Sequence, residues 1–187
     1  ARALLRAAQD GKLADCLDTP RLSPEVASFL HDLLGDAAAE ARVADGIKGV
    51  LQADYRPQAS ENALRLGYLL TAQGSMPLDH ARWLPANARL AGARLAREDF
   101  TALSLPAADL RGADLFECSF YGASLPGALL DDANLDKADL SSVDLEDASL
   151  KGTHLQGARL VGARLARADL EGARLEGTNL RQLQAPA

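Results

Sequence analysis

Hydrophobic residues in the second half of the chain recur at every fifth position. From residue 90 to residue 180 each fifth residue is Leu, apart from Phe100 and Phe120. The residue two places before each of these positions is usually Ala, and the glycines of this half fall two places after it, as at Gly92 and Gly112. The repeat therefore reads small, polar, Leu, polar, then Gly or polar. It predicts one structural unit for every five residues.

A five-residue period fits neither an α-helix nor a flat strand. Five helical residues advance the side chain about 140° beyond a full turn, so the leucines would wind around the whole helix. In a strand, successive leucines would point to opposite faces. The backbone must instead turn a corner in each repeat, so the pattern predicts a solenoid with the leucines inside and Gly at corners.

Charged residues indicate how many repeats complete one coil. Residues one coil apart stack at about 4.8 Å, where opposite charges stabilise and like charges repel. A separation of twenty residues gives opposite pairs such as Asp144 with Arg164, whereas a separation of fifteen gives like pairs such as Asp132 with Asp147. Four repeats per coil predict a square cross-section and about five coils. We expect the structural core to include Phe100, Phe120, Leu140 and Leu160.

The repeat resembles that of the pentapeptide-repeat family, whose unit is A(D/N)LXX. The unit occurs literally at Ala108-Asp109-Leu110, Ala113-Asp114-Leu115, Ala133-Asn134-Leu135, Ala138-Asp139-Leu140 and Ala168-Asp169-Leu170. The resemblance covers residues 86–187 and implies a right-handed quadrilateral β-helix; the handedness comes from the resemblance alone. We therefore predict an α+β fold class, with the β-helix over residues 86–182 and a tail over residues 183–187.

The first 85 residues predict a small α-helical domain that caps the solenoid. Residues 23–25 (Ser-Pro-Glu) supply an N-cap, a first-turn Pro and an acid before apolar residues at helical spacing up to residue 34. A second helix is expected from residue 36 to the approach of Pro57, and a third over residues 60–74. Solenoids need such caps because a terminal coil exposes core and unpaired backbone.

Composition narrows the class of partner. The 187 residues are 48% hydrophobic, 25% charged and only 4% aromatic, with a formal net charge of -6. Direct nucleic-acid binding is not expected, because such affinity comes from neutralising phosphates. No stretch is apolar enough for a bilayer and no signal-peptide pattern opens the chain, so we expect the bacterial cytoplasm, with secretion by another route as the alternative. Since the first residue is Ala1 rather than Met, a fragment or processed chain is expected.

Signatures of catalysis or metal binding are not found in the sequence. No HExxH, GxSxG, GxGxxG or phosphate-loop string occurs, and His31, His80 and His154 are scattered. Cys16 and Cys118 form neither a disulfide framework nor a metal site, and Cys118 occupies the small inward position as a compact hydrophobe. We expect no catalytic residue, no cofactor, no metal and no enzyme activity.

Three large apolar residues fall on outward positions and form the candidate partner surface: Phe116, Tyr121 and Leu129. Cover by the helices or a loop is the equal alternative for them. We predict a non-catalytic protein-interaction module or scaffold, with a homodimer through the C-terminal solenoid edge as one form of partner.

The family resemblance adds two further functions. One is a part in a bacterial type VI secretion effector or accessory protein. The other is modulation of DNA gyrase or topoisomerase by DNA mimicry, which needs acidic surface along the whole rod. Acidic residues are concentrated in residues 131–147, whereas all the charged residues of 151–167 are basic. We expect the acidic and the basic coil to pair with each other, which argues against mimicry.

Overall fold

The computed structural model describes residues 6–7, 10, 12–18, 37–54, 56–73 and 84–184. The chain divides into two compact units, Ala1–Arg89 and Leu90–Ala187. The division after residue 85 expected from the sequence stays a prediction. Each unit is described by itself below.

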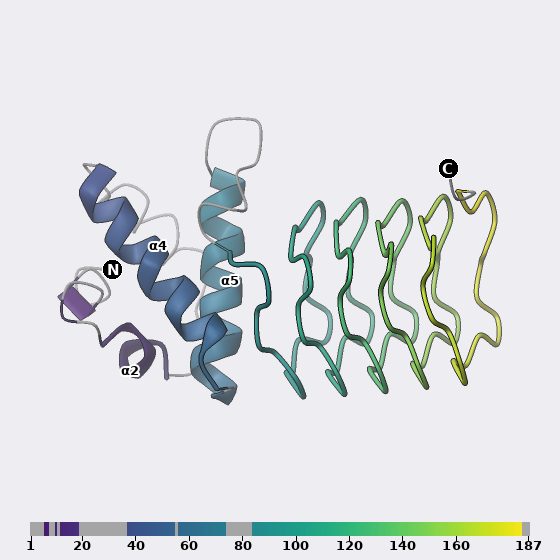
Figure 1. Cartoon of the computed structure of the whole chain (residues 1–187), viewed down its shortest axis with the longest axis horizontal. Coiled ribbons are helices and arrows are strands. Elements are labelled where there is room, and N and C mark those ends of the chain that lie inside the picture. The colour runs from purple at the N-terminus through teal and green to yellow at the C-terminus, as the bar shows by residue number, and fades with distance from the viewer. Residues whose placement is uncertain are drawn as a thin grey trace. The chain divides into compact units, whose positions relative to one another are not determined.

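The first unit is helical, with α2 over Leu13–Leu17, α4 over Ala37–Gln52 and α5 over Pro57–Gln73 (Figure 1). Helix α4 buries Val43, Ile47 and Leu51, which follow the expected helical spacing. The helix predicted after residues 23–25 lies outside the described residues. Helix α5 begins before the predicted residue 60, because Pro57 suits the first helical position with its fixed φ and missing N–H.

Close packing in the first unit depends on glycine and on one buried amide. A Cβ on Gly67 would lie 2.5 Å from Leu84 Cδ2. Leu84 can therefore pack against this side of α5 only because residue 67 has no side chain. The Asn62 side chain on α5 donates a hydrogen bond of 3.0 Å to the buried carbonyl of Leu17, which fixes α2 on α5. None of the helices in the described ranges is long and apolar enough to span a membrane.

The second unit is a stack of coils in which parallel bridges join residues twenty apart. The bridge residues form four columns, so the backbone makes four sides per coil and turns a corner between them. Figure 1 shows the coils stacked one after another. We name the sides by their bridge residues: side 1, Asp109, Leu129, Ser149 and Asp169; side 2, Arg94, Asp114, Asn134, His154 and Arg174; side 3, Asp99, Ser119, Asp139, Arg159 and Asn179; side 4, Ser104, Ser124, Asp144, Arg164 and Gln184.

The centre of the coils is filled by the periodic apolar residues. Phe100 and Phe120 are 1% and 2% exposed, and their ring centroids lie 5.6 Å apart. Leu140 and Leu160 continue the same column and are fully buried. The residue two places before the leucine is also buried up to Ala163, apart from Glu98, so the interior of these coils holds two side chains per repeat.

Each corner contains a residue with positive φ, and eight of the corners also have a local side-chain bond. Asp132, for example, has φ of 57°, a conformation that Asp tolerates better than most residues with a side chain. On the residue before the inward leucine, a carboxylate or amide oxygen accepts the N–H two residues later, as Asp139 Oδ1 does from Ser141 at 3.0 Å. The same bond forms at Asp99, Asp109, Asp114, Asn134, Asp144, Asp169 and Asn179. It explains physically why the repeat favours Asp or Asn there.

Charge pairs at the predicted twenty-residue spacing do form between coils. Ion pairs join Arg97 with Glu117, Glu117 with Lys137, Asp144 with Arg164, Asp147 with Arg167, and Lys151 with Glu171. Arg111 instead pairs at 2.7 Å with Asp109 of its own corner, because the Asx bond at that corner brings the two residues together.

Replacing Leu140 by Asp should unfold the coils. The change removes a fully buried leucine and leaves a carboxylate without partners, a loss of roughly 5 kcal/mol. Ser142→Asp is the matched control, because Ser142 is exposed at the adjoining corner. Thermal melting followed by circular dichroism checks both variants; cooperative melting of Leu140→Asp at the parent temperature would contradict the inward placement.

The corner bond predicts a difference between two changes at Asp139. Asp139→Ala should lower the free energy of unfolding by about 1 kcal/mol, since the Ser141 N–H loses its acceptor. Asp139→Asn should stay close to the parent, because the amide oxygen accepts the same bond. Urea titration measures both, and equal losses would show that the charge of Asp139 matters rather than the bond.

Candidate interaction surface

The ring of Phe116 is covered by neighbouring cations. It is half-buried at the corner between sides 2 and 3, with the Arg97 guanidinium 5.7 Å and Lys137 Nζ 5.3 Å from the ring centroid. Glu117 holds both cations, at 3.0 Å from Arg97 and 3.7 Å from Lys137. The two cations therefore stay over the ring from the coils below and above.

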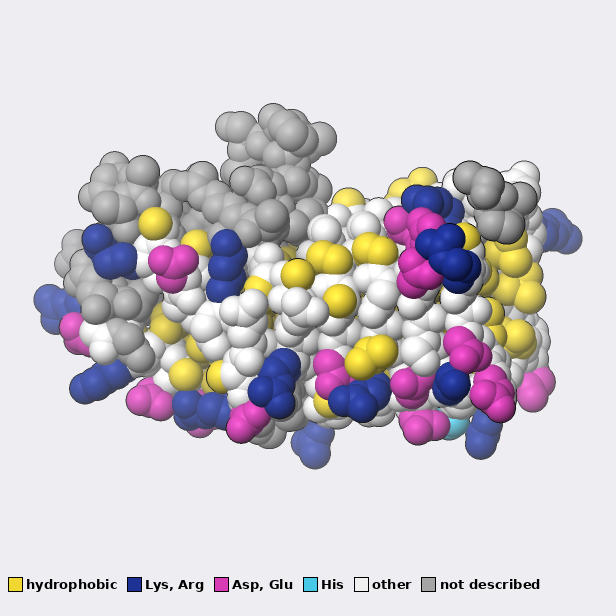
Figure 2. All heavy atoms as spheres, in the orientation of Figure 1, with side chains coloured by type: hydrophobic (Ala, Val, Ile, Leu, Met, Phe, Trp, Pro, Cys, Tyr) yellow, Lys and Arg dark blue, Asp and Glu magenta, His cyan; other side chains and the backbone are white. Residues whose placement is uncertain are grey.

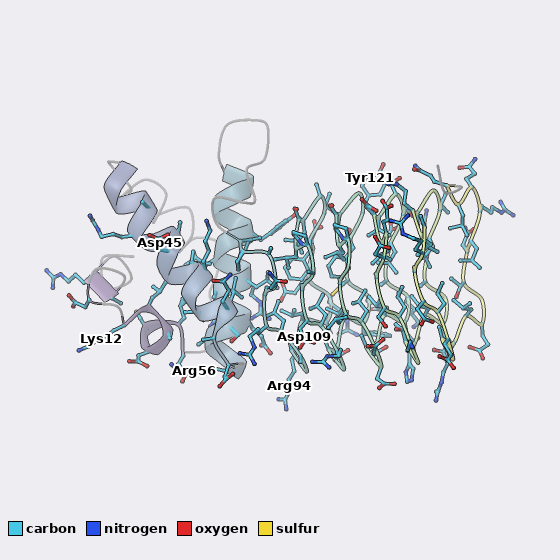
Figure 3. The ribbon with its side chains drawn as sticks, in the orientation of Figure 1. Lys12, Asp45, Arg56, Arg94, Asp109 and Tyr121 are labelled. Atoms are coloured by element: carbon cyan, nitrogen blue, oxygen red, sulfur yellow. The ribbon has the colours of Figure 1, made fainter. Side chains whose placement is uncertain are left out.

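Tyr121 is the most exposed large apolar side chain in the described part of the chain, at 54%. It lies at the corner between sides 3 and 4, five residues after Phe116. In Figure 3 it lies at the edge of the coils away from Arg94 and Asp109. The ring of Tyr121 is therefore exposed to solvent at its corner, whereas the ring of Phe116 is half-buried at the preceding corner.

Leu129 lies half-buried in the middle of side 1, between Asp109 and Ser149. Side 4 separates it from Tyr121, so the structure places the three predicted residues around the coil rather than in one cluster. Their role as a partner surface stays a prediction.

Side 4 of the early coils carries no charge, and the sequence analysis did not single it out. Residues 100–108 and 118–130 contain no Asp, Glu, Lys or Arg, and stacking twenty residues apart brings these stretches together. We call their outward residues, continued by Leu129 on side 1, the uncharged face: Thr101, Ser104, Pro106, Tyr121, Ser124, Pro126 and Leu129. The signal was present in the sequence as two charge-free runs offset by one coil.

A charged cluster borders the uncharged face on the next coils. Arg167 binds Asp147 and Glu146 at 2.6 Å each, and Arg164 binds Glu146 at 2.7 Å and Asp144 at 3.1 Å. The guanidinium of Arg167 lowers the pKa of Asp147, and Asp147 raises the pKa of Arg167 in turn. Figure 2 shows an area without charged side chains over part of the coils, beside a group of blue and magenta atoms.

Of the remaining reactive side chains, Cys118 serves packing. Cys118 is buried, its thiol donates to the Leu95 carbonyl at 2.9 Å, and burial raises its pKa to about 12. His154 lies on side 2 between Asn134 and Arg174, whereas His31 and His80 lie outside the described residues. Across the described ranges no group of His, Cys, Asp and Glu could hold a metal ion.

Comparison with known proteins finds one family model, described as pentapeptide repeats, which matches residues 86–120, 113–152 and 144–182. No curated protein matches the chain. Solved structures do match, and each is similar over about half of this chain.

HetL, a pentapeptide-repeat protein involved in heterocyst differentiation regulation in the cyanobacterium Nostoc sp. strain PCC 7120, is 30% identical, with 53% of this chain and 58% of HetL covered and a TM-score of 0.39. A pentapeptide-repeat protein of the Arabidopsis thaliana thylakoid lumen is 29% identical, with 54% and 67% covered and a TM-score of 0.41. QnrB1, a plasmid-mediated fluoroquinolone resistance protein, is 21% identical, with 49% and 53% covered and a TM-score of 0.25. The chain thus spans less than two thirds of HetL.

Burial of Cys118 predicts a thiol that reacts only on unfolding. In a Cys16→Ser variant, whose single thiol is Cys118, a disulfide reagent should label the folded chain at least a hundredfold more slowly than the urea-unfolded chain. The reason is the raised pKa together with the buried sulfur. Labelling of the folded variant as fast as the unfolded one at pH 8 would contradict the inward placement of this side chain.

Proposed function

The chain belongs to the pentapeptide-repeat family, and from that premise we propose that it is a non-catalytic scaffold that binds a protein partner through the uncharged face. Family membership supports a right-handed quadrilateral β-helix, with about five coils proposed from the repeat count. The helical first unit is proposed as the cap of this solenoid.

The observation that carries the proposal is the contrast between the uncharged face and the rest of the coils. Elsewhere the outward positions hold ion pairs between coils, such as Arg97 with Glu117. The centres of protein interfaces are poor in charged residues and rich in tyrosine, because a charge must be desolvated before it is buried. An uncharged area around the exposed ring of Tyr121 meets both conditions.

The covered environment of Phe116 divides the candidate residues by role. Tyr121 and Leu129 are proposed as direct contacts, since they continue the uncharged face. Phe116 is proposed to stabilise its corner of the coil through cation–π contacts with Arg97 and Lys137. Those two cations would have to move before a partner could contact the ring.

The described charges do not favour DNA mimicry. Side 3, for example, passes from Asp139 to Arg159 one coil later, and side 4 passes from Asp144 to Arg164. A mimic of DNA needs negative charge in every coil along one side. Modulation of gyrase or topoisomerase therefore remains the alternative, and the type VI role and the bacterial cytoplasm stay predictions.

The proposal predicts that partner capture depends on Tyr121. Affinity capture from a bacterial lysate, followed by mass spectrometry, should recover a protein that Tyr121→Ser loses by about tenfold or more, as for an aromatic at the centre of an interface. Arg174→Ser is the matched control, because Arg174 is exposed on side 2, opposite side 4. Circular dichroism should show both variants folded.

Two results would contradict this function. Equal capture by the parent, Tyr121→Ser and Arg174→Ser would remove the uncharged face as the contact. Inhibition of gyrase supercoiling by the purified chain, retained in Tyr121→Ser, would establish the DNA-mimic alternative instead.

A further inference from the structure

The uncharged face continues beyond the early coils along one corner, the corner between sides 3 and 4. Four successive coils have no Asp, Glu, Lys or Arg there, and we call these residues the uncharged corner: Thr101, Ala102, Tyr121, Gly122, Ser141, Ser142, Val161 and Gly162. Within residues 131–147, by contrast, each of the other three corners carries charge. A partner that contacts Tyr121 can therefore extend as far as Val161 without desolvating a charge.

An arginine without an ion pair lies beside the far end of the uncharged corner. Arg159 on side 3 is exposed and comes two residues before Val161. Within the described part of the chain its guanidinium has no ion-pair partner, although Asp139 occupies the same column one coil earlier. The other three cations of residues 151–167 all bind acids: Lys151, Arg164 and Arg167.

The adjoining corner explains why Arg159 differs from Arg164. The Arg164 guanidinium is held by Asp144 one coil earlier and also by Glu146 at the next corner. The corner next to Arg159 is the uncharged corner, so it supplies no second acid. The Arg159 backbone N–H donates to the Ala138 carbonyl at 2.9 Å, so the backbone is fixed while the guanidinium remains available to a partner.

We infer that the protein bound by the uncharged face presents a carboxylate to the guanidinium of Arg159. An arginine without an acid of its own chain can take a carboxylate without first breaking an ion pair, and its fork fits both carboxylate oxygens. Tyr121 lies two coils before Val161, so this carboxylate lies about 10 Å along the coils from the place where the partner receives the tyrosine ring. The inference rests on the proposed function and names the chemistry of its partner.

A protein carboxylate suits Arg159 better than the phosphates of a nucleic acid. Asp139 and Asp144 lie on either side of the uncharged corner, one coil before Arg159. A phosphate backbone carries negative charge along its whole length and would meet these acids, whereas a protein can place a single carboxylate at the arginine. The formal net charge of -6 opposes a polyanion in the same way.

Affinity capture at two salt concentrations tests the role of Arg159. From a nuclease-treated bacterial lysate, Arg159→Gln should capture the protein that depends on Tyr121 about fivefold less well than the parent at about 50 mM NaCl, because a charge pair at the interface is lost. The two chains should differ less at about 500 mM NaCl, where salt screens the pair. Arg174→Gln is the matched control, since Arg174 is an exposed arginine on side 2, and it should capture as well as the parent.

Carbodiimide crosslinking tests the contact itself. Arg159→Lys keeps the positive charge and supplies an amine, which the reagent joins to a touching carboxylate as an amide with loss of water. Mass spectrometry should show position 159 joined to an Asp or Glu of the captured protein, and adding Tyr121→Ser should remove this crosslink. Arg174→Lys should give no crosslink at position 174, and circular dichroism should show all variants folded.

The outcomes separate this inference from the proposed function. Capture that depends on Tyr121 but is unchanged in Arg159→Gln, or that gives no crosslink at position 159, would overturn the inference and leave the proposed function standing. Absence of any protein whose capture depends on Tyr121 would overturn both. Capture that is lost on nuclease treatment would show a nucleic acid at this face and would also overturn the carboxylate.

Discussion

Backbone pairing between residues twenty apart is the constraint on which the second unit depends. Leu140, for instance, donates its N–H to Arg159 one coil later, and Asp139 donates to Cys118 one coil earlier. Such ladders can form only if every repeat returns the chain to the same side, so each corner must turn by the same amount. The positive φ of the second corner residue fixes that turn locally, and an Asp or Asn oxygen supports it at eight of the corners, for example at Asp139.

Because the inward residues and the corners maintain the fold, the outward residues of the coils are available for function. The leucine and the small residue of each repeat point inward, and the bridge residue and the first corner residue point outward. Exposed ion pairs contribute little stability each, so exchange of one outward residue for another costs the fold little. An uncharged face beside the Arg164 and Arg167 cluster is thus a difference in surface chemistry on an unchanged backbone.

The sequence by itself determined the repeat, the inward columns and the side count, because a five-residue period and a twenty-residue charge spacing repeat many times and average out local exceptions. It located the segment of α4 but began the next helix late, since Pro57 reads both as a helix stop and as a first helical residue. Only the tertiary structure decided the neighbours of each outward side chain. Phe116 and Tyr121 occupy the same position in successive repeats, yet residues one coil away cover one ring with Arg97 and Lys137 and leave the other exposed. That difference depends on contacts between coils, and the five-residue period of the sequence does not specify those contacts.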